Sequence, residues 1–197
     1  MKNNIFIISV IVISLFSCSN NDLDRTIFIP DEKDSNLPAY TEWGYNSFGA
    51  KYDRTHFISS QKIVPCKIIY KNDTLKFSLN GVVIRDNNRP DMTLEFSFPS
   101  NAMTKYSDLA HLNNITIDLA SNNCGVKIFQ DNTEKTLDIL TGTLHFKRTQ
   151  LLYVDEKENR LIISGVFNVQ FLEKGYPTSI SDGRFDMGID EKVFWAY

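Results

Sequence analysis

Residues 39–197 alternate apolar and polar side chains with a period of two, in many short runs separated by turn-forming residues. Because side chains two positions apart point to the same face of a strand, each run has one apolar face and one more polar face. This alternation is typical of antiparallel sheets that have one face on a core and the other in water. The clearest runs are CKIIY (66–70), TLKFSL (74–79), MTLEFSF (92–98), ITIDL (115–119) and GRFDMGI (183–189).

Two pairs of runs predict hairpins. The residues KND (71–73) separate the first two runs and favour a tight turn. Nearer the carboxyl end, TGTLHFKRTQLLYV (141–154) is followed by the charged turn DEKENR (155–160) and then by LIISGVFNVQFL (161–172). The second of these strands has most of its apolar residues at odd positions, and Gly165 lies in the same row.

The parity of the apolar positions changes at two places. The apolar residues of 137–139 are at odd positions and those of 144–146 at even positions, which predicts a bulge or bend at Gly142. Near Ser47 the aromatic residues change parity in the same way, which predicts a second bulge beside Gly49.

One segment, NAMTKYSDLAHLNN (101–114), departs from the strand pattern. Its residues Tyr106, Leu109 and Leu112 have helical spacing, and Thr104 or Ser107 could cap the helix. We therefore expect one short helix among many short strands. The sequence predicts an all-β domain, either an antiparallel β-sandwich or a barrel-like meander.

The first 17 residues, MKNNIFIISVIVISLFS, carry one positive charge at Lys2 and then an apolar stretch over 5–16. This stretch has the length of a secretory signal core and is shorter than the roughly 20 residues that span a bilayer. The segment therefore predicts an export signal rather than a buried strand of the domain.

Residues 15–18, LFSC, resemble the lipobox of bacterial lipoproteins. The resemblance implies that the Cys18 thiol receives a diacylglycerol and that the peptide is cut before it, which leaves 180 of the 197 residues. Two or three acyl chains hold a protein on a membrane, because each buried methylene contributes about 0.8 kcal/mol. We expect a lipoprotein signal peptide over 1–17, a flexible linker over 18–38 and a single β-rich domain over 39–197.

The predicted linker is rich in Asn, Asp and Ser, which is typical of a mobile segment. We interpret its acids Asp31, Glu32 and Asp34 as solvated charges. The short apolar patch 27–29 could add an edge strand or dock on the domain. The residues SNND (19–22) resemble an acidic signal for surface export, and both surface and periplasmic facing stay open.

The chain carries a formal net charge of −3, which becomes −4 once Lys2 is removed. This mild acidity argues against nucleic acid as a partner, because duplex binding depends on clustered Lys and Arg. The sequence has no HExxH, no GxSxG and no phosphate-binding glycine loop, and its three histidines are far apart. We therefore expect a protein without enzymatic activity, catalytic residues or a cofactor.

Three acids, Asp182, Asp186 and Asp190, recur every four residues near the carboxyl end. Carboxylates are suitable calcium ligands, but residues four apart on a strand are about 13 Å apart and cannot share one ion. We interpret the three acids as a solvated polar face of a strand, and we expect no metal site.

Two cysteines, Cys66 and Cys124, remain after Cys18 is lipidated. They could form a disulfide in an oxidising envelope. The alternative is two separate thiols, with Cys66 filling space in the core. No CxxC pair is present, so a zinc site is not expected.

Aromatic residues gather over 40–52. Trp43 and Tyr45 share one face of the predicted strand and form a candidate binding surface, since Trp and Tyr are enriched at binding hot spots. Burial in the core is the favoured interpretation for most of these rings.

The segment YTEWGYNSFGAKYD (40–53) and the later series GTLHF, LIISGVFNVQF and ISDGRFDM are similar to uncharacterised lipoproteins of Bacteroidetes. That resemblance implies a lipobox, a short linker, one β-rich domain and a place at the outer membrane of the cell envelope. It supplies no catalytic residues.

These observations together predict a lipid-anchored envelope protein that binds a glycan or a protein. Two alternatives are a lipocalin-like carrier of a small apolar molecule and a structural accessory subunit of an outer-membrane complex. An exposed Trp43 or Trp195 on a flat, polar-rimmed face would favour a glycan or protein ligand. An apolar cavity of about 300 Å³ or more would favour the carrier.

Overall fold

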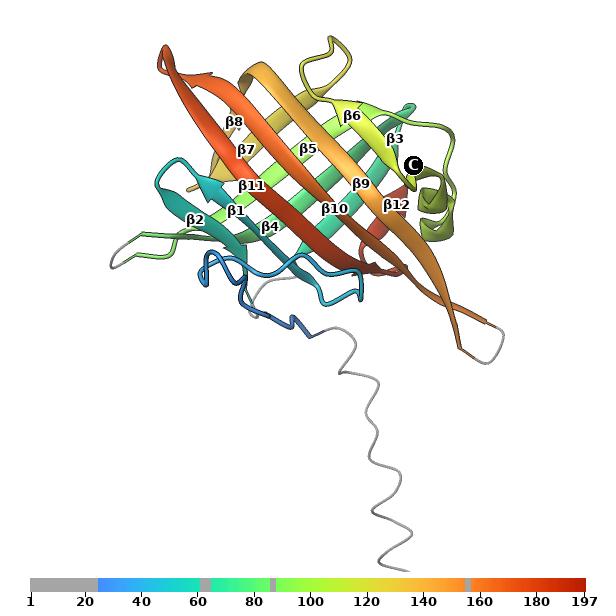
Figure 1. Cartoon of the computed structure of the whole chain (residues 1–197). Helices are drawn as coiled ribbons and strands as arrows, with labels where there is room; N and C mark the ends of the chain where they lie inside the picture. The colour runs from blue at the N-terminus through green and yellow to red at the C-terminus, as the bar shows by residue number, and fades with distance from the viewer. Residues whose placement is uncertain (1–24, 61–64, 86–87, 155–156) are drawn as a thin grey trace, which may run out of the picture.

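The computed structural model describes residues 25–60, 65–85, 88–154 and 157–197, which form a curled antiparallel sheet with one short 3₁₀ helix (Figure 1). The predicted signal peptide and Cys18 lie outside the described residues. The all-β fold with one short helix is therefore confirmed, and the sheet is curled into a half-barrel.

The elements follow one another along the chain with short connections. Their bounds are β1 (Ser47–Tyr52), β2 (Thr55–Ser59), β3 (Cys66–Lys71), β4 (Thr74–Ile84), β5 (Asp91–Pro99), η3 (Tyr106–Leu112), β6 (Ile115–Asp118), β7 (Gly125–Gln130), β8 (Thr133–Thr136), β9 (Asp138–Val154), β10 (Lys157–Glu173), β11 (Tyr176–Ile189) and β12 (Phe194–Ala196).

The order of the strands in the sheet is β6-β9-β10-β11-β1-β2-β4-β5-β7-β8. The long strand β4 pairs with β3 along its first half and with β2 along its second half. The short β12 lies parallel to β3, while the other pairs of strands are antiparallel. At Leu137 the chain passes from β8, at one edge of the sheet, directly into β9, which is next to the opposite edge. We call β9, β10 and β11 one arm of the curled sheet and β4, β5 and β7 the other arm.

Both predicted hairpins are confirmed. Asn72 and Asp73 have φ values of 50° and 56° in the turn between β3 and β4, which are the left-handed values that a tight hairpin turn requires. The strands β9 and β10 pair along most of their 17-residue lengths. Because β10 begins at Lys157, most of the charged run 155–160 belongs to the strand and not to the turn.

The predicted irregularity near Gly142 is present, but the predicted bulge in the strand at Gly49 is not, because β1 begins only at Ser47 and pairs with β2 without a break. Pairing between β9 and β10 skips Leu140, two residues before Gly142. Beside Gly49, the extra residues lie on the partner strand β11, where Asp182 and Gly183 stand opposite Ala50. A bulge increases the local twist of a strand, so both features help the sheet to curl.

The helix η3 packs Tyr106, Leu109 and Leu112 against the core, as their spacing predicts. The prediction of its cap is wrong, because the side chain of Asp108 accepts hydrogen bonds from the backbone N–H groups of Thr104 at 2.8 Å and Lys105 at 3.1 Å. No helix among the described residues has the length and apolar character needed to cross a membrane.

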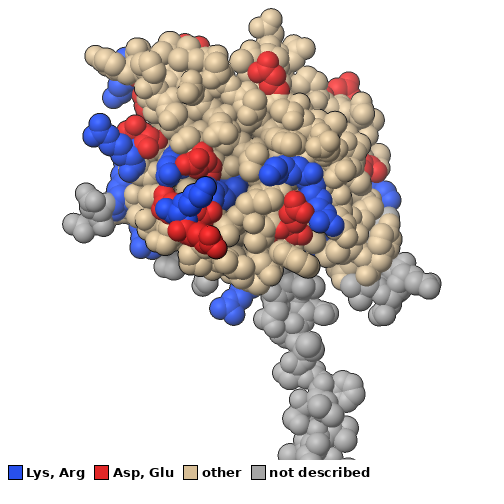
Figure 2. All heavy atoms as spheres, in the orientation of Figure 1, with Lys and Arg blue, Asp and Glu red and all other residues tan. Residues whose placement is uncertain are grey.

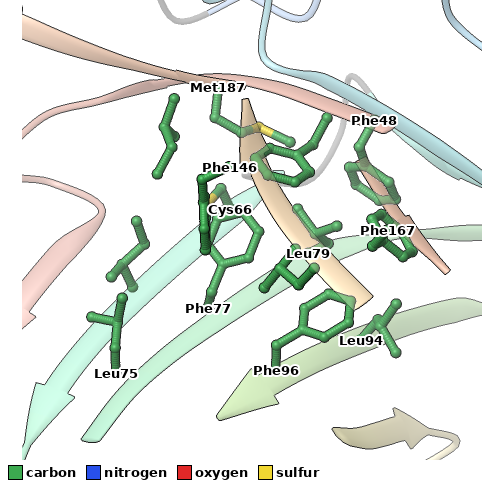
Figure 3. Close-up of a cluster of buried hydrophobic side chains, with 14 of the residues drawn as sticks. Phe48, Cys66, Leu75, Phe77, Leu79, Leu94, Phe96, Phe146, Phe167 and Met187 are labelled. Carbon is green, nitrogen blue, oxygen red and sulfur yellow. The ribbon is translucent and has the colours of Figure 1, made fainter. Parts of the chain in front are cut away.

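Phenylalanine rings from both arms of the sheet fill its concave side (Figure 3). Phe77 on β4 lies 5.7 Å from Phe146 on β9, measured between ring centroids. Phe96 on β5 lies 5.2 Å from Phe167 on β10. Edge-to-face contacts of this kind contribute about 0.5–1.5 kcal/mol each beyond the burial of area. These contacts hold the two arms together across the core.

Gly165 on β10 makes room for one of these rings. A Cβ atom at this position would lie 2.6 Å from the ring of Phe185 and 2.1 Å from the carbonyl oxygen of His145. Both neighbours are fixed, since Phe185 is buried and the carbonyl belongs to strand β9. This explains why a glycine stands in the apolar row of β10.

We expect Gly165→Ala to lower the free energy of unfolding by about 3 kcal/mol, because the added methyl group overpacks the core. The control is Gly125→Ala, whose methyl group would meet one rotatable atom, Ser97 Oγ, at 3.0 Å. Urea denaturation followed by circular dichroism measures both variants. Equal stabilities of the two variants would contradict the packing role of Gly165.

Candidate functional site

Residues 25–46, which we call the strap, lie across the outer face of the sheet near one end of β1 and β11 (Figure 1). Two parts of the strap pair with each other, because the N–H of Ile27 donates to the carbonyl of Tyr45 at 2.8 Å and the N–H of Ala39 to the carbonyl of Ile29 at 2.7 Å. The strap is therefore an ordered layer with its own hydrogen bonds.

Apolar packing also attaches the strap to the sheet. The side chain of Leu37 is fully buried. Gly49 on β1 allows this close approach, since a Cβ atom there would lie 2.3 Å from the ring of Pro38. The described part of the predicted linker, residues 25–38, thus lies on the domain rather than ahead of it, and the boundary predicted at residue 38 needs this correction.

Ion pairs fix the acidic part of the strap, where the sequence predicted solvated charges. Asp31 accepts a hydrogen bond from Arg184 on β11 at 2.6 Å. The backbone N–H of Lys33 and the Arg184 guanidinium hold the pKa of Asp31 below its ordinary value. For Asp31 the prediction is therefore wrong, because strand β11 places a cation beneath the strap.

Asp34 has two partners on the neighbouring strands. Its carboxylate lies 2.9 Å from Nε2 of His56 on β2 and 3.7 Å from Nζ of Lys51 on β1. The hydrogen bond with His56 is the main cause of the lowered pKa of Asp34. Acidic and basic side chains are accordingly interleaved where the strap crosses the sheet (Figure 2).

The strongest link between strap and sheet is the carboxylate of Asp186 on β11, which is 2% exposed. It accepts hydrogen bonds from the hydroxyl of Thr41 at 2.6 Å and from the backbone N–H of Gly44 at 2.7 Å. The backbone N–H groups of Trp43 and Tyr45 donate to it at 3.0 and 3.2 Å. Gly44 has a φ of +74°, which suits glycine and lets the chain wrap around the carboxylate.

The three regularly spaced acids consequently differ in their surroundings. Asp182 is exposed and pairs with Lys51 at 2.8 Å, as expected of a surface carboxylate. Asp190 pairs with Arg160 at 3.7 Å. The interpretation as a solvated face is wrong for Asp186, because the strap covers this part of the outer face. Within the described residues, no group of three or more His, Cys, Asp or Glu side chains could hold a metal ion.

A groove lies where the strap meets β9 and β10. It has a volume of about 440 Å³ and is lined by residues 40–43 of the strap, by Arg148, Gln150 and Leu152 of β9, and by Ile162 of β10. We call it the Trp43 groove. Trp43 is 72% exposed, although its backbone is fixed by Asp186.

Polar side chains form a connected network at this groove. The hydroxyl of Tyr40 donates to Glu42 at 2.8 Å, and the guanidinium of Arg148 donates to Glu42 at 2.9 Å and to Gln150 at 2.6 Å. The Arg148 hydrogen bond is the largest cause of the lowered pKa of Glu42, and burial raises the pKa of Tyr40 to about 12. Neither group is therefore poised to exchange protons near neutral pH.

The aromatic residues of 40–52 are divided between the core and this surface. Phe48 is fully buried, as the core interpretation expects. Trp43 is exposed, and Tyr45 is half-buried beside it in the strap. The strap therefore presents Trp43 outwards, although sequence reasoning favoured burial for most of these rings.

The polar residues of the groove were not singled out in the sequence. Glu42 and Arg148 are 106 positions apart in the chain, and in the sequence neither residue can be distinguished from an ordinary surface charge. The pairing appears when the strap lies against β9. No local motif carries that information, and the residues of the groove with a signal in the sequence were the aromatic Tyr40 and Trp43.

Cys66 and Cys124 are both free thiols, so the disulfide considered for them is not present. Cys66 lies on β3 and Cys124 directly precedes β7, and the strands β4 and β5 lie between these two. Three strand spacings of about 4.8 Å are well beyond the reach of about 7 Å that a disulfide allows. Burial raises the pKa of the Cys66 thiol, as expected of a core cysteine.

Comparisons of the chain with protein-family models, with curated proteins and with solved structures found no match.

We expect Asp186→Asn to loosen the strap. An asparagine is isosteric, but its amide group would direct N–H donors at the backbone N–H groups that surround this position. Unsatisfied buried donors cost about 1–3 kcal/mol, so we expect the free energy of unfolding to fall by about 2 kcal/mol. Trypsin should also cleave faster at Lys33, which is exposed on the strap.

The matched control for this prediction is Asp182→Asn, at the exposed acid of the same strand. Its surface ion pair with Lys51 contributes about 1 kcal/mol or less. Urea denaturation and timed proteolysis compare the two variants. An Asp186→Asn variant that resists trypsin as well as Asp182→Asn would show that the carboxylate does not hold the strap.

Proposed function

We propose that this protein is a lipid-anchored, non-enzymatic binding module of the cell envelope, and that the Trp43 groove binds its ligand. The observation that carries this proposal is an exposed side chain on a fixed backbone at Trp43. A large aromatic side chain is 72% exposed, while its own backbone N–H is bonded to a buried carboxylate. Because the backbone that carries the indole is already fixed, binding a partner has to order only the two side-chain torsions of Trp43, which limits the loss of conformational entropy.

The chemistry around the indole favours a carbohydrate. The C–H groups of a sugar ring carry partial positive charge and stack on the negative face of an aromatic ring. The hydroxyl groups of a sugar need fixed donors and acceptors, and Glu42, Arg148 and Gln150 supply them at one wall of the groove. The groove holds about 440 Å³, which is within the range of small-ligand sites.

The filled core argues against the alternative of a lipocalin-like carrier. The rings of Phe77, Phe146 and Phe185 contact one another where such a carrier would hold its ligand, with centroids 5.0–5.7 Å apart. The interior of the curled sheet is therefore occupied by side chains at this level. The groove that we propose as the ligand site lies on the opposite, outer face.

The anchor is supported by the lipobox-like residues 15–18 and the preceding apolar stretch. Attachment through Cys18 would place the domain at the outer membrane, facing either the periplasm or the surface. A surface glycan or a periplasmic glycan would then be within reach of the groove.

We expect Trp43→Ala to weaken glycan binding at least about tenfold, because aromatic anchors of a binding site contribute about 2 kcal/mol or more. An array of immobilised bacterial and plant glycans serves as the probe for the purified lipoprotein. The conservative variant Trp43→Phe should retain part of the binding, since it keeps an aromatic face.

The control is Tyr153→Ala, which removes an aromatic side chain that is 59% exposed on β9 and does not line the groove. This variant should bind as the unchanged protein does. Glycan binding that survives Trp43→Ala would place the site elsewhere, and a failure of the unchanged protein to bind any glycan would refute this ligand class.

We expect Cys18→Ala to abolish lipid attachment, because the acylated sulfur is removed. Metabolic labelling with radioactive palmitate, followed by detergent phase partition, measures the attached lipid. Cys66→Ala is the matched control and should keep the label, since Cys66 is buried in the domain. Label that persists in Cys18→Ala would refute the anchor.

A further inference from the structure

Three consecutive apolar residues of the strap are exposed. Ile27, Phe28 and Ile29 are 43%, 36% and 42% exposed, and we call them the apolar lip. Single exposed apolar residues are common, but a continuous exposed patch marks an interaction surface.

The backbone of the lip is hydrogen-bonded within the strap, so the exposure of its side chains belongs to an ordered segment. Ile27 and Ile29 each make a backbone hydrogen bond within the strap, to Tyr45 and Ala39. The preceding residue, Thr26, is buried. The N–H of Ile27 and the carbonyl of Ile29 are thus already partnered, so these two groups stay satisfied when the lip enters an apolar medium.

The position of the lip in the chain indicates what it contacts. Eight residues separate Ile27 from Cys18, the residue that we propose to be lipidated. An extended chain spans at most about 3.3–3.6 Å per residue, so the lip stays within roughly 30 Å of the anchoring sulfur. No other part of the described strap lies closer to the anchor in sequence, apart from Arg25 and Thr26.

We infer that the apolar lip inserts into the interface of the membrane that carries the Cys18 lipid. This inference rests on the lipid anchor of the proposed function. The anchor keeps the lip close to the bilayer, and burial of the three side chains among the lipids removes their apolar surface from water. The contact would orient the domain, with the strap at the membrane and the turn between β10 and β11 pointing away from it (Figure 1).

Quenching of tryptophan fluorescence by brominated lipids tests this contact in the full lipoprotein. Trp43→Phe and Trp195→Phe remove the two native tryptophans, and Phe28→Trp then places one reporter in the lip. The matched control carries Tyr176→Trp instead, at a residue that is 76% exposed beside the turn between β10 and β11. Each protein is reconstituted into phosphatidylcholine vesicles with or without bromine on the upper acyl chain.

We expect bromine to reduce the emission of Phe28→Trp by about half, since interfacial segments sit about 5–10 Å into the boundary between headgroups and acyl chains. The emission of Tyr176→Trp should not change. Equal quenching of the two reporters, or no quenching of Phe28→Trp, would overturn the inference. A blue shift of Phe28→Trp that depends on protein concentration and not on bromine would also overturn it, in favour of a second copy of the chain.

Flotation of the same vesicles separates this inference from the proposed anchor. If the protein floats with the vesicles while Phe28→Trp stays unquenched, the lipid anchor is supported and membrane insertion of the lip is refuted. Protein that does not float refutes the anchor, and the membrane contact of the lip is refuted with it.

Discussion

The outer face of the sheet depends on one buried carboxylate. A carboxylate removed from water is costly unless hydrogen bonds replace its hydration, and Asp186 receives four such bonds from residues 41–45. The same bonds satisfy backbone N–H groups that a strap lying over a sheet would otherwise leave unpaired. Asp186 and the strap therefore require each other. The direction of the Trp43 side chain and the shape of its groove follow from that one arrangement.

A second constraint acts on the inner face, where two arms of the sheet must meet over phenylalanine rings. The glycine at position 165 gives Phe185 its space, and the bulges at Leu140 and at 182–183 increase the twist of the longest strands. The bulge at 182–183 also separates the exposed Asp182 from the buried Asp186 along β11. Strand β11 therefore contributes both to the curl of the sheet, through its bulge, and to the attachment of the strap, through Asp186.

The sequence predicted what depends on neighbours along the chain. The alternation of apolar residues gave the strands, the KND turn gave the hairpin of β3 and β4, and the parity change near Gly142 gave the irregularity at Leu140. It did not predict that Leu37 is buried or that Asp186 is shielded from solvent, because both depend on how the strap lies on the sheet, and Asp186 is more than 140 positions from the strap residues that cover it. The alternation within a strand predicts that a polar residue on its outer face is solvated, and it contains no information on whether another segment covers that face. For the same reason Trp43 was weighed as a core residue, since the strand pattern could not show that residues 40–46 lie outside the sheet.

The lip and the groove belong to the same strap, and this links the two proposals. Ile27 is bonded to Tyr45, two residues after Trp43, so the groove lies close to the part of the domain that we place on the membrane. A ligand bound there would be a glycan presented at the surface of that same membrane rather than one free in solution. Confinement to one surface raises the effective concentration of such a ligand, so a shallow site with one aromatic platform and one wall of polar groups can bind it without high intrinsic affinity. A groove of this modest size would then be sufficient, because the proposed lipid anchor and lip would keep the domain close to a ligand on the same membrane.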